Sequence, residues 1–352
     1  MNRLIVILGT LFCVSGYAQT EVSMGITRGK DFGVVYMLPK TEVRLEVKTV
    51  KVLYTPGKFS KYADRYLHLT NVSQEPEEYW QFIGVNVNAV GIPDEKRTYF
   101  IKMKDKSIAP LVELTTNGII KSINVPYDRK PKENVSTTII PKKKKEDPFS
   151  FLTEEILITG SSAKMAELVA KEIYNIRESK NALLRGQADN MPQDGAQLKL
   201  MIDGLNEQET ALLTMFLGTE EREEKIHTFC VVPNGERGDE VIFRFSKKLG
   251  IVTADNLAGA PIYMSLKDLK SIMIPPETKR KDADGVAYNV PGRVAIALTK
   301  DKEVLFNGEF PATQFGIIEY LTPTLFNGKS TLKIIFNETT GGLIKVDKEN
   351  TK

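Results

Sequence analysis

One residue spacing in the sequence could support nucleophilic catalysis. Ser161 and Lys164 are three residues apart at the predicted start of a helix, where a lysine amine can act as the base for a serine hydroxyl. The same spacing recurs at Ser330 and Lys333, and neither pair is accompanied by a Lys-Thr-Gly motif. Helix capping by Ser161 is therefore the favoured interpretation, and Ser161 and Lys164 stay as candidates for a serine-lysine hydrolase.

The sequence has no complete motif for a metal or a cofactor. Asp282 to Gly285 resembles part of a calcium loop, but Arg280 and Pro291 stand where the first and last ligands belong. His227 and Cys230 are three residues apart in a predicted strand, so their side chains point to opposite faces and cannot bind one ion together. We therefore predict no metal site and no cofactor.

Aromatic residues supply the candidate binding residues. Tyr62 and Tyr66 are four residues apart in a predicted short helix, and Tyr79 and Trp80 are neighbours in the chain. Aromatic rings offer flat apolar faces to a ligand, so these four residues are candidates for a glycan-binding surface. Packing of Tyr62 and Tyr66 against the predicted β-sheet is the favoured alternative.

The N-terminus has the pattern of a cleavable signal peptide. Arg3 supplies a positive charge, residues 4–14 form an apolar run, and Gly16-Tyr-Ala18 provides small residues at a cleavage site. The apolar run is only about 16 Å long, which is well short of a bilayer core of about 30 Å. Cys13 lies inside this run and does not follow a small residue. We therefore expect export to the periplasm or beyond without lipidation, and a mature chain that begins at Gln19.

Composition limits the class of protein. The chain has 352 residues, with 48 Lys and Arg against 45 Asp and Glu and a net charge of +3. This balance, together with export, argues against nucleic acid as the partner. No segment after the signal peptide approaches 18 consecutive apolar residues, so no transmembrane helix is expected. Residues 126–150 are rich in lysine and proline and are predicted to be an exposed basic linker.

Residues 22–125 have the pattern of a β-rich domain. Apolar and charged residues alternate over residues 43–48, and the apolar residues then change phase, which predicts a bulge near Lys48 and Thr49. Further strands are predicted at residues 80–89 and 98–103 with a turn at 91–94 between them, and a short helix is predicted within residues 59–69.

Residues 151–218 form the clearest helical segment. Apolar residues recur there at spacings of three and four, and the helix faces are expected to pack together as a central helical hairpin. Binding of a partner helix by these faces is the alternative, although about two heptads is short for a coiled coil. Helices are predicted from Ser161 or Ser162 to Gly186, from Asp194 onward, and from Asn206 to Gly218.

Residues 224–347 return to the pattern of a β-rich domain. The first two strands of this region are predicted to form a hairpin across the loop at residues 233–239. Strands followed by helices and then by strands favour an α+β fold, with two sandwich-like, mainly antiparallel β-domains and a helical hairpin between them. The predicted strands are residues 228–232, 240–245, 262–266, 293–299, 303–310, 332–336 and 343–346.

Four phrases of the sequence carry a resemblance to a known family. They are Tyr36-Met-Leu-Pro-Lys-Thr41 and the residues 59–67, 163–178 and 188–195. They resemble an uncharacterised family of exported Bacteroidetes proteins, the domain of unknown function 4831. The resemblance covers nearly the whole mature chain and implies a Gram-negative periplasmic or secreted setting. It implies no catalytic or binding residues.

These observations favour an exported cell-envelope protein with a non-enzymatic role in interaction or assembly. The expected partner is another envelope protein or a glycan. A glycan-binding module that uses Tyr62, Tyr66, Tyr79 and Trp80 is the first alternative. A hydrolase that uses Ser161 and Lys164 is the second.

The signal peptide makes a direct prediction about the mature protein. Protein recovered from the envelope or the medium should have the intact mass of residues 19–352 with no attached lipid. A chain that keeps its first eighteen residues, or that carries a diacylglyceryl group, would contradict the prediction. A variant with Ala18→Glu at the cleavage site should accumulate uncleaved, which makes it the control.

Overall fold

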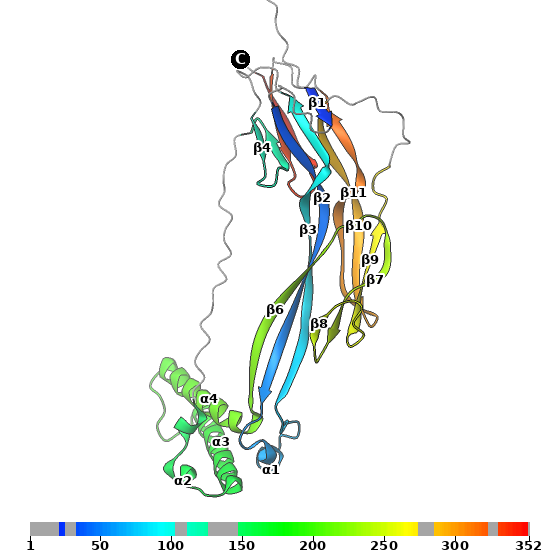
Figure 1. Ribbon diagram of the computed structural model, residues 1–352. Coiled ribbons are helices and arrows are strands. Elements are labelled where there is room, and N and C mark those ends of the chain that lie inside the picture. Colours follow the sequence, from blue (N-terminus) through cyan, green and yellow to red (C-terminus); the bar gives the residue numbers. More distant parts are fainter. Residues whose placement is uncertain are drawn as a thin grey trace, which may run out of the picture.

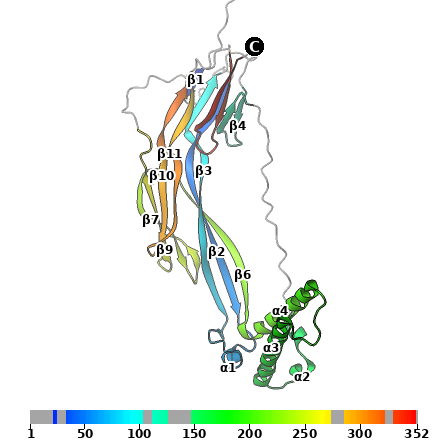
Figure 2. The ribbon, with the colours of Figure 1, turned by 180° about the vertical axis from the view of Figure 1, so that it is seen from behind.

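A computed structural model describes residues 21–24, 33–102, 111–125, 147–273, 285–322 and 330–350. The predicted signal peptide and residues 126–146 of the predicted basic linker lie outside the described residues. So do Asp282 and Asp284 of the partial calcium motif. The molecule is elongated, with β-sheets over most of its length and the helices gathered at one end (Figures 1 and 2).

The strands form three sheets, and every strand pair in them is antiparallel. The prediction of a β-rich fold with mainly antiparallel strands is therefore confirmed. The first sheet has the order β1 (Glu21–Met24), β3 (Glu77–Lys102), β2 (Gly33–Thr55), β6 (Thr219–Val231). The second has the order β11 (Glu303–Leu321), β10 (Val286–Lys300), β9 (Ala260–Asp268), β7 (Arg237–Ser246), β8 (Gly250–Val252). The third has the order β13 (Leu343–Asn350), β12 (Ser330–Phe336), β5 (Ile120–Ile123), β4 (Val112–Leu114).

The long strands β2 and β3 pair along nearly their whole length and continue as a ribbon beyond the second sheet, with β6 on the other side of β2 (Figures 1 and 2). We call this ribbon the arm, residues 48–55, 77–84 and 219–226. The predicted bulge is confirmed, because the register shifts between Lys48 and Thr49. The predicted turn at residues 91–94 is wrong: β3 runs through this segment, and a shift of register accommodates residues 94–97.

The helices lie at the free end of the arm. We call them the head: η1 (Ser60–Tyr62) and α1 (Ala63–Leu67) between β2 and β3, and η2 (Pro148–Phe151), α2 (Glu154–Leu157), α3 (Ser162–Arg185) and α4 (Gly195–Leu217) before β6. Ser161 and Asp194 cap α3 and α4, and Gly186 ends α3 in the left-handed conformation, as the sequence predicts. The predicted third helix is wrong. Asn206 lies inside the continuous helix α4, and Glu209, three residues later, is paired with Arg177 and Lys180 of α3.

The two strands that follow the head pair differently from the prediction. β6 pairs with β2, whereas β7 pairs with β8 and β9, so the two strands do not form the predicted hairpin. The segment between them carries the chain from the first sheet to the second. A tight turn at Asp301 and Lys302 joins β10 to β11, and both residues have positive φ.

The sheets pack on each other through shared apolar cores. One core joins Val43, Leu45 and Val87 of the first sheet to apolar residues of β9, β10 and β11. Another joins Tyr36 and Tyr99 to residues of all three sheets. Each core therefore combines strands from both sides of the helical segment. Apolar side chains on facing sheets exclude water from each other, which is the main stabilising term for such layers.

The hairpins β2–β3 and β10–β11 resemble each other in sequence and in the position where the strand register shifts. Gly33-Val-Val-Tyr36 opens the first, Gly285-Val-Ala-Tyr288 opens the second, and a proline follows each tyrosine three residues later. Close to each proline the register shifts, accommodating residues 94–97 in β3 and residues 313–316 in β11. In the second hairpin the shift needs glycine, because a Cβ at Gly316 would lie 2.0 Å from the carbonyl oxygen of Val290.

Buried polar groups join the two hairpins where these irregularities meet. The Thr41 amide donates to Thr313 Oγ1 (3.1 Å), and the Thr313 amide donates to Thr41 Oγ1 (3.0 Å). Tyr36 Oη accepts from the amide of Ala287 (2.9 Å) and donates to its carbonyl (3.2 Å). Burial raises the pKa of Tyr36 far above its ordinary value, so the hydroxyl stays protonated and keeps both roles.

Asn289 completes this network from the second hairpin. Its fully buried Nδ2 donates to the carbonyls of Pro39 (2.9 Å) and Thr340 (2.8 Å). An unsatisfied buried carbonyl costs about 1–3 kcal/mol, so this one side chain supports two segments of the core.

Replacing Asn289 by alanine should therefore lower the free energy of unfolding by about 2–3 kcal/mol, since both carbonyls lose their donor. Urea unfolding followed by circular dichroism would measure the change. The matched control is Asn307→Ala at an exposed position of β11, for which a change below about 0.5 kcal/mol is expected. Equal effects of the two substitutions would show that the network does not hold the hairpins together.

Candidate functional site

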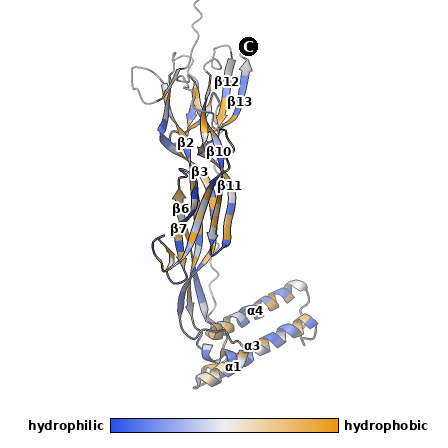
Figure 3. Cartoon of the chain, turned by 90° about the vertical axis from the view of Figure 1, so that its right-hand side faces the viewer, coloured by the Kyte–Doolittle hydropathy of each residue, from blue (hydrophilic) through white to orange (hydrophobic). Residues whose placement is uncertain are grey.

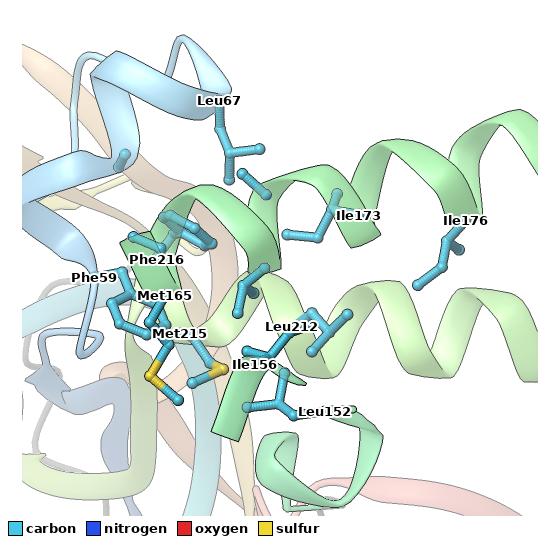
Figure 4. Close-up of a cluster of buried hydrophobic side chains, with 14 residues drawn as sticks. Phe59, Leu67, Leu152, Ile156, Met165, Ile173, Ile176, Leu212, Met215 and Phe216 are labelled. Atoms are coloured by element: carbon cyan, nitrogen blue, oxygen red, sulfur yellow. The ribbon is translucent and has the colours of Figure 1, made fainter. Parts of the chain in front are cut away.

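The head has a hydrophobic core at the end nearest the arm. Figure 4 shows α3 and α4 contributing Met165, Ile173, Leu212 and Phe216, with Phe59 from the segment before η1 packed against them. The rings of Phe59 and Phe216 are 5.5 Å apart between centroids. Helices α1 and α2 and the turn η2 cover this end, so the inner part of the helix pair has a third layer. The core members from these covering segments are Ala63, Leu67, Leu152 and Ile156.

An ion-pair cluster holds α3 and α4 together halfway along their length. Glu209 Oε1 accepts from Arg177 Nε (2.6 Å), and Glu209 Oε2 accepts from Lys180 Nζ. Partial burial would raise the pKa of Glu209, but the hydrogen bonds from Lys180 and Arg177 outweigh it and hold the pKa below its usual value. Glu209 is therefore ionised at neutral pH, and its carboxylate joins the two helices. Figure 3 shows α3 and α4 side by side.

Beyond this cluster the helix pair has an open groove of about 610 Å³. Leu183 and Leu205 line its sides, and its surface also includes the small residues Ser179, Ala182 and Gly204. Two apolar residues of α4 on the groove are exposed to solvent, Leu200 at 74% and Met201 at 42%. No residue of this groove was among the predicted site residues, although the apolar positions of α4 could have indicated it.

A larger groove of about 830 Å³ runs along the outer edge of β3, where the second sheet meets the arm. Its lining includes Tyr79 and Trp80, two of the predicted binding residues. Acidic and basic side chains line it together with the aromatic ones. The residues are Glu77, Glu78, Tyr79, Trp80, Gln81, Phe82, Ile83, Phe245, Lys247 and Lys300.

Trp80 is held in this groove by several contacts. Its amide donates to the carbonyl of Lys247 (2.7 Å) in the turn between β7 and β8. Gly250 has positive φ and its backbone lies against the indole, because a Cβ there would be 2.9 Å from the ring. The ammonium of Lys225 lies 5.3 Å from the ring centroid. The indole is therefore half-buried, with only part of its surface open to a ligand.

The other predicted site residues lie elsewhere. Tyr62 and Tyr66 belong to the head and pack beside its hydrophobic core, with ring centroids 6.1 Å apart. Ser161 Oγ accepts the amide of Lys164 as a helix cap, and Lys164 Nζ forms an ion pair with Glu167 (2.9 Å). Both chemical groups of the Ser161 and Lys164 pair thus have other partners.

Cys230 differs from the expected behaviour of a lone thiol in a strand. A free cysteine in a strand is usually a small buried apolar residue, but Cys230 is exposed. It is paired between strands β6 and β2 with the exposed Arg44, so both side chains lie on the solvent face of the sheet. Within the described ranges, no group of three His, Cys, Asp or Glu side chains could hold a metal ion.

Over the part of the chain that the structure describes, no helix is both long enough and apolar enough to cross a bilayer.

Comparison with known protein families identifies the family of this chain. Residues 32–344 match the family model described as Domain of unknown function (DUF4831). The chain belongs to this family. No curated protein and no solved structure matches it. The family description names no activity.

Proposed function

We propose that this chain is an exported cell-envelope protein, periplasmic or secreted, that acts as a non-enzymatic module for interaction or assembly. The signal-peptide pattern of residues 1–18 supports export. The head supports the interaction role, because it stands at the end of the arm and carries exposed apolar side chains around a groove. Apolar surface of this kind on a folded domain is typical of protein-binding sites.

The observation that carries the proposal is the exposure of Leu200 and Met201 in the groove of the head. Transfer of a leucine or methionine side chain from water to an apolar contact contributes about 1.5–3 kcal/mol. Two such residues beside an open groove provide an energetic reason for a protein partner to bind there. We expect another protein of the envelope as that partner.

The double substitution Leu200→Glu/Met201→Glu should abolish complexes made through the head, because it places two charges in the apolar contact. In-cell crosslinking in the native host, followed by immunoblotting, should show at least about a tenfold loss of crosslinked species. The control is Val304→Glu, at an exposed apolar position in β11. Complexes that persist in the double variant, or that are lost equally in the control, would contradict the proposal.

A glycan-binding role is the second candidate, favoured by one observation. Tyr79 and Trp80 line the same groove as Glu77, Glu78 and Gln81. An aromatic surface beside carboxylates and an amide can stack on a sugar ring and bond to its hydroxyls. The groove is open along the edge of β3, which suits a chain-like polysaccharide.

Trp80 makes this alternative directly measurable, because it is the only tryptophan in the chain. Binding of a polysaccharide should give a saturable change in its fluorescence. Tyr79→Ala should weaken that binding by about tenfold, whereas Tyr66→Ala in the head should leave it unchanged. A panel of soluble polysaccharides that leaves the emission of Trp80 unaltered would contradict the glycan role.

A further inference from the structure

Among the described residues, none forms a third layer over the outer half of the helix pair, whereas the inner half has one. Helix α4 is described over its whole length, and its buried residues are Ala211, Leu212, Met215 and Phe216 at the end nearest the arm. Residues 195–210 of the same helix are all exposed or half-buried. Two packed helices cannot enclose an apolar core by themselves, so α-helical folds add further helices to cover it. The apolar side of the outer half of the head is therefore left uncovered by the part of the chain that the structure describes.

Gly204 is a second, independent observation at the same place. It lies inside α4 on the surface of the groove, where glycine destabilises a helix by about 1 kcal/mol relative to alanine. No described part of the chain requires a glycine there, because an added Cβ would meet nothing within 4 Å. The absence of a side chain instead leaves a depression that an approaching side chain can enter.

The same surface also carries an exposed apolar side chain that can fill such a depression. Leu200 is four residues before Gly204, one helical turn away, and 74% of it is exposed. A symmetric contact between two identical chains requires a surface that is complementary to itself. A two-fold axis across α4 near residue 202 meets this requirement, because it sets Leu200 of each copy against Gly204 of the other.

Charge is compatible with this arrangement. The outer part of the helix pair, residues 176–208, has four basic and five acidic residues, so two copies can approach with little net repulsion. The outer part of α4 is about 21 Å long for its first fourteen residues, enough for several turns of antiparallel contact. Leu183 and Leu205, which line the groove, would become the inner layer of a four-helix arrangement.

We propose that the groove of the head binds a second copy of this chain, with α4 packed against α4 in an antiparallel, two-fold symmetric contact. This inference rests on the proposed interaction role of the head and names its partner. An amphipathic helix of another protein would also fill this groove. Such a partner would not require Leu200 of this chain to fit the depression at Gly204 of the same chain.

Analytical ultracentrifugation of the mature chain, residues 19–352, tests the proposal. The wild-type protein should form a dimer within a concentration range of up to about 200 µM. Gly204→Leu should raise the dimer Kd at least about tenfold, because it fills the depression that receives Leu200. The same substitution should keep or raise the Tm, because leucine favours the helix more than glycine does. This variant therefore separates loss of the contact from loss of folding.

Leu200→Glu should weaken the dimer to a similar degree by removing the apolar side chain that fills the depression. The control is Leu184→Glu on α3, which is exposed but does not line the groove, and its Kd should equal that of the wild type. A wild-type chain that stays monomeric at about 200 µM overturns the proposal, and so do variants that dimerise as well as the wild type.

The two proposals fail in different ways. If the purified chain is monomeric but Leu200→Glu/Met201→Glu still removes complexes in cells, self-association is wrong and the partner is another protein. If the double variant changes nothing in cells and the purified chain is monomeric, both proposals are wrong.

Discussion

The structure depends on the hydrogen bonds that join its two long hairpins at Thr41 and Thr313. Strand β6 pairs with β2 only from Val43 onward, so the backbone of Thr41 has no strand neighbour on that side. Thr313 and Gln314 supply the missing partners: Gln314 Nε2 donates to the carbonyl of Thr41 (2.7 Å), and the two threonines bond to each other's amides. Without them, buried backbone groups would cost about 1–3 kcal/mol each.

The strand that forms this junction, β2, also continues into the arm. Strand β2 has 23 residues and spans about 75 Å, so it connects the shared core to the head without interruption. Its apolar side faces the other sheets at Val43 and Leu45, while its distal end carries the head. One end of β2 is therefore held in the shared core, and the other end positions the apolar surface of the head far from that core. This arrangement suits a contact with another chain, because the head can be engaged without disturbing the sheets.

Local features of the fold could be predicted from the sequence, while pairings between distant segments could not. Ser161 and Asp194 were identified as caps because capping depends on residues three positions away. The bulge at Lys48 and Thr49 followed from a change of phase within one strand. The β6–β7 hairpin was wrong because the choice of strand partner depends on residues far along the chain. The similarity of Gly33–Pro39 to Gly285–Pro291 is a sequence signal that the two hairpins are alike, and the predictions did not use it.

The candidate sites divide in the same way. Sequence alone determined the starts of α3 and α4, most strand positions, the aromatic residues Tyr79 and Trp80, and the pattern of a signal peptide, because short-range spacing encodes each of them. Only the tertiary structure decided that Trp80 shares a groove with Lys300, that Ser161 and Lys164 have other partners, and that Gly204 lies open beside Leu200. These outcomes depend on which surfaces the packed helices and sheets bury, and burial is a property of the folded chain as a whole.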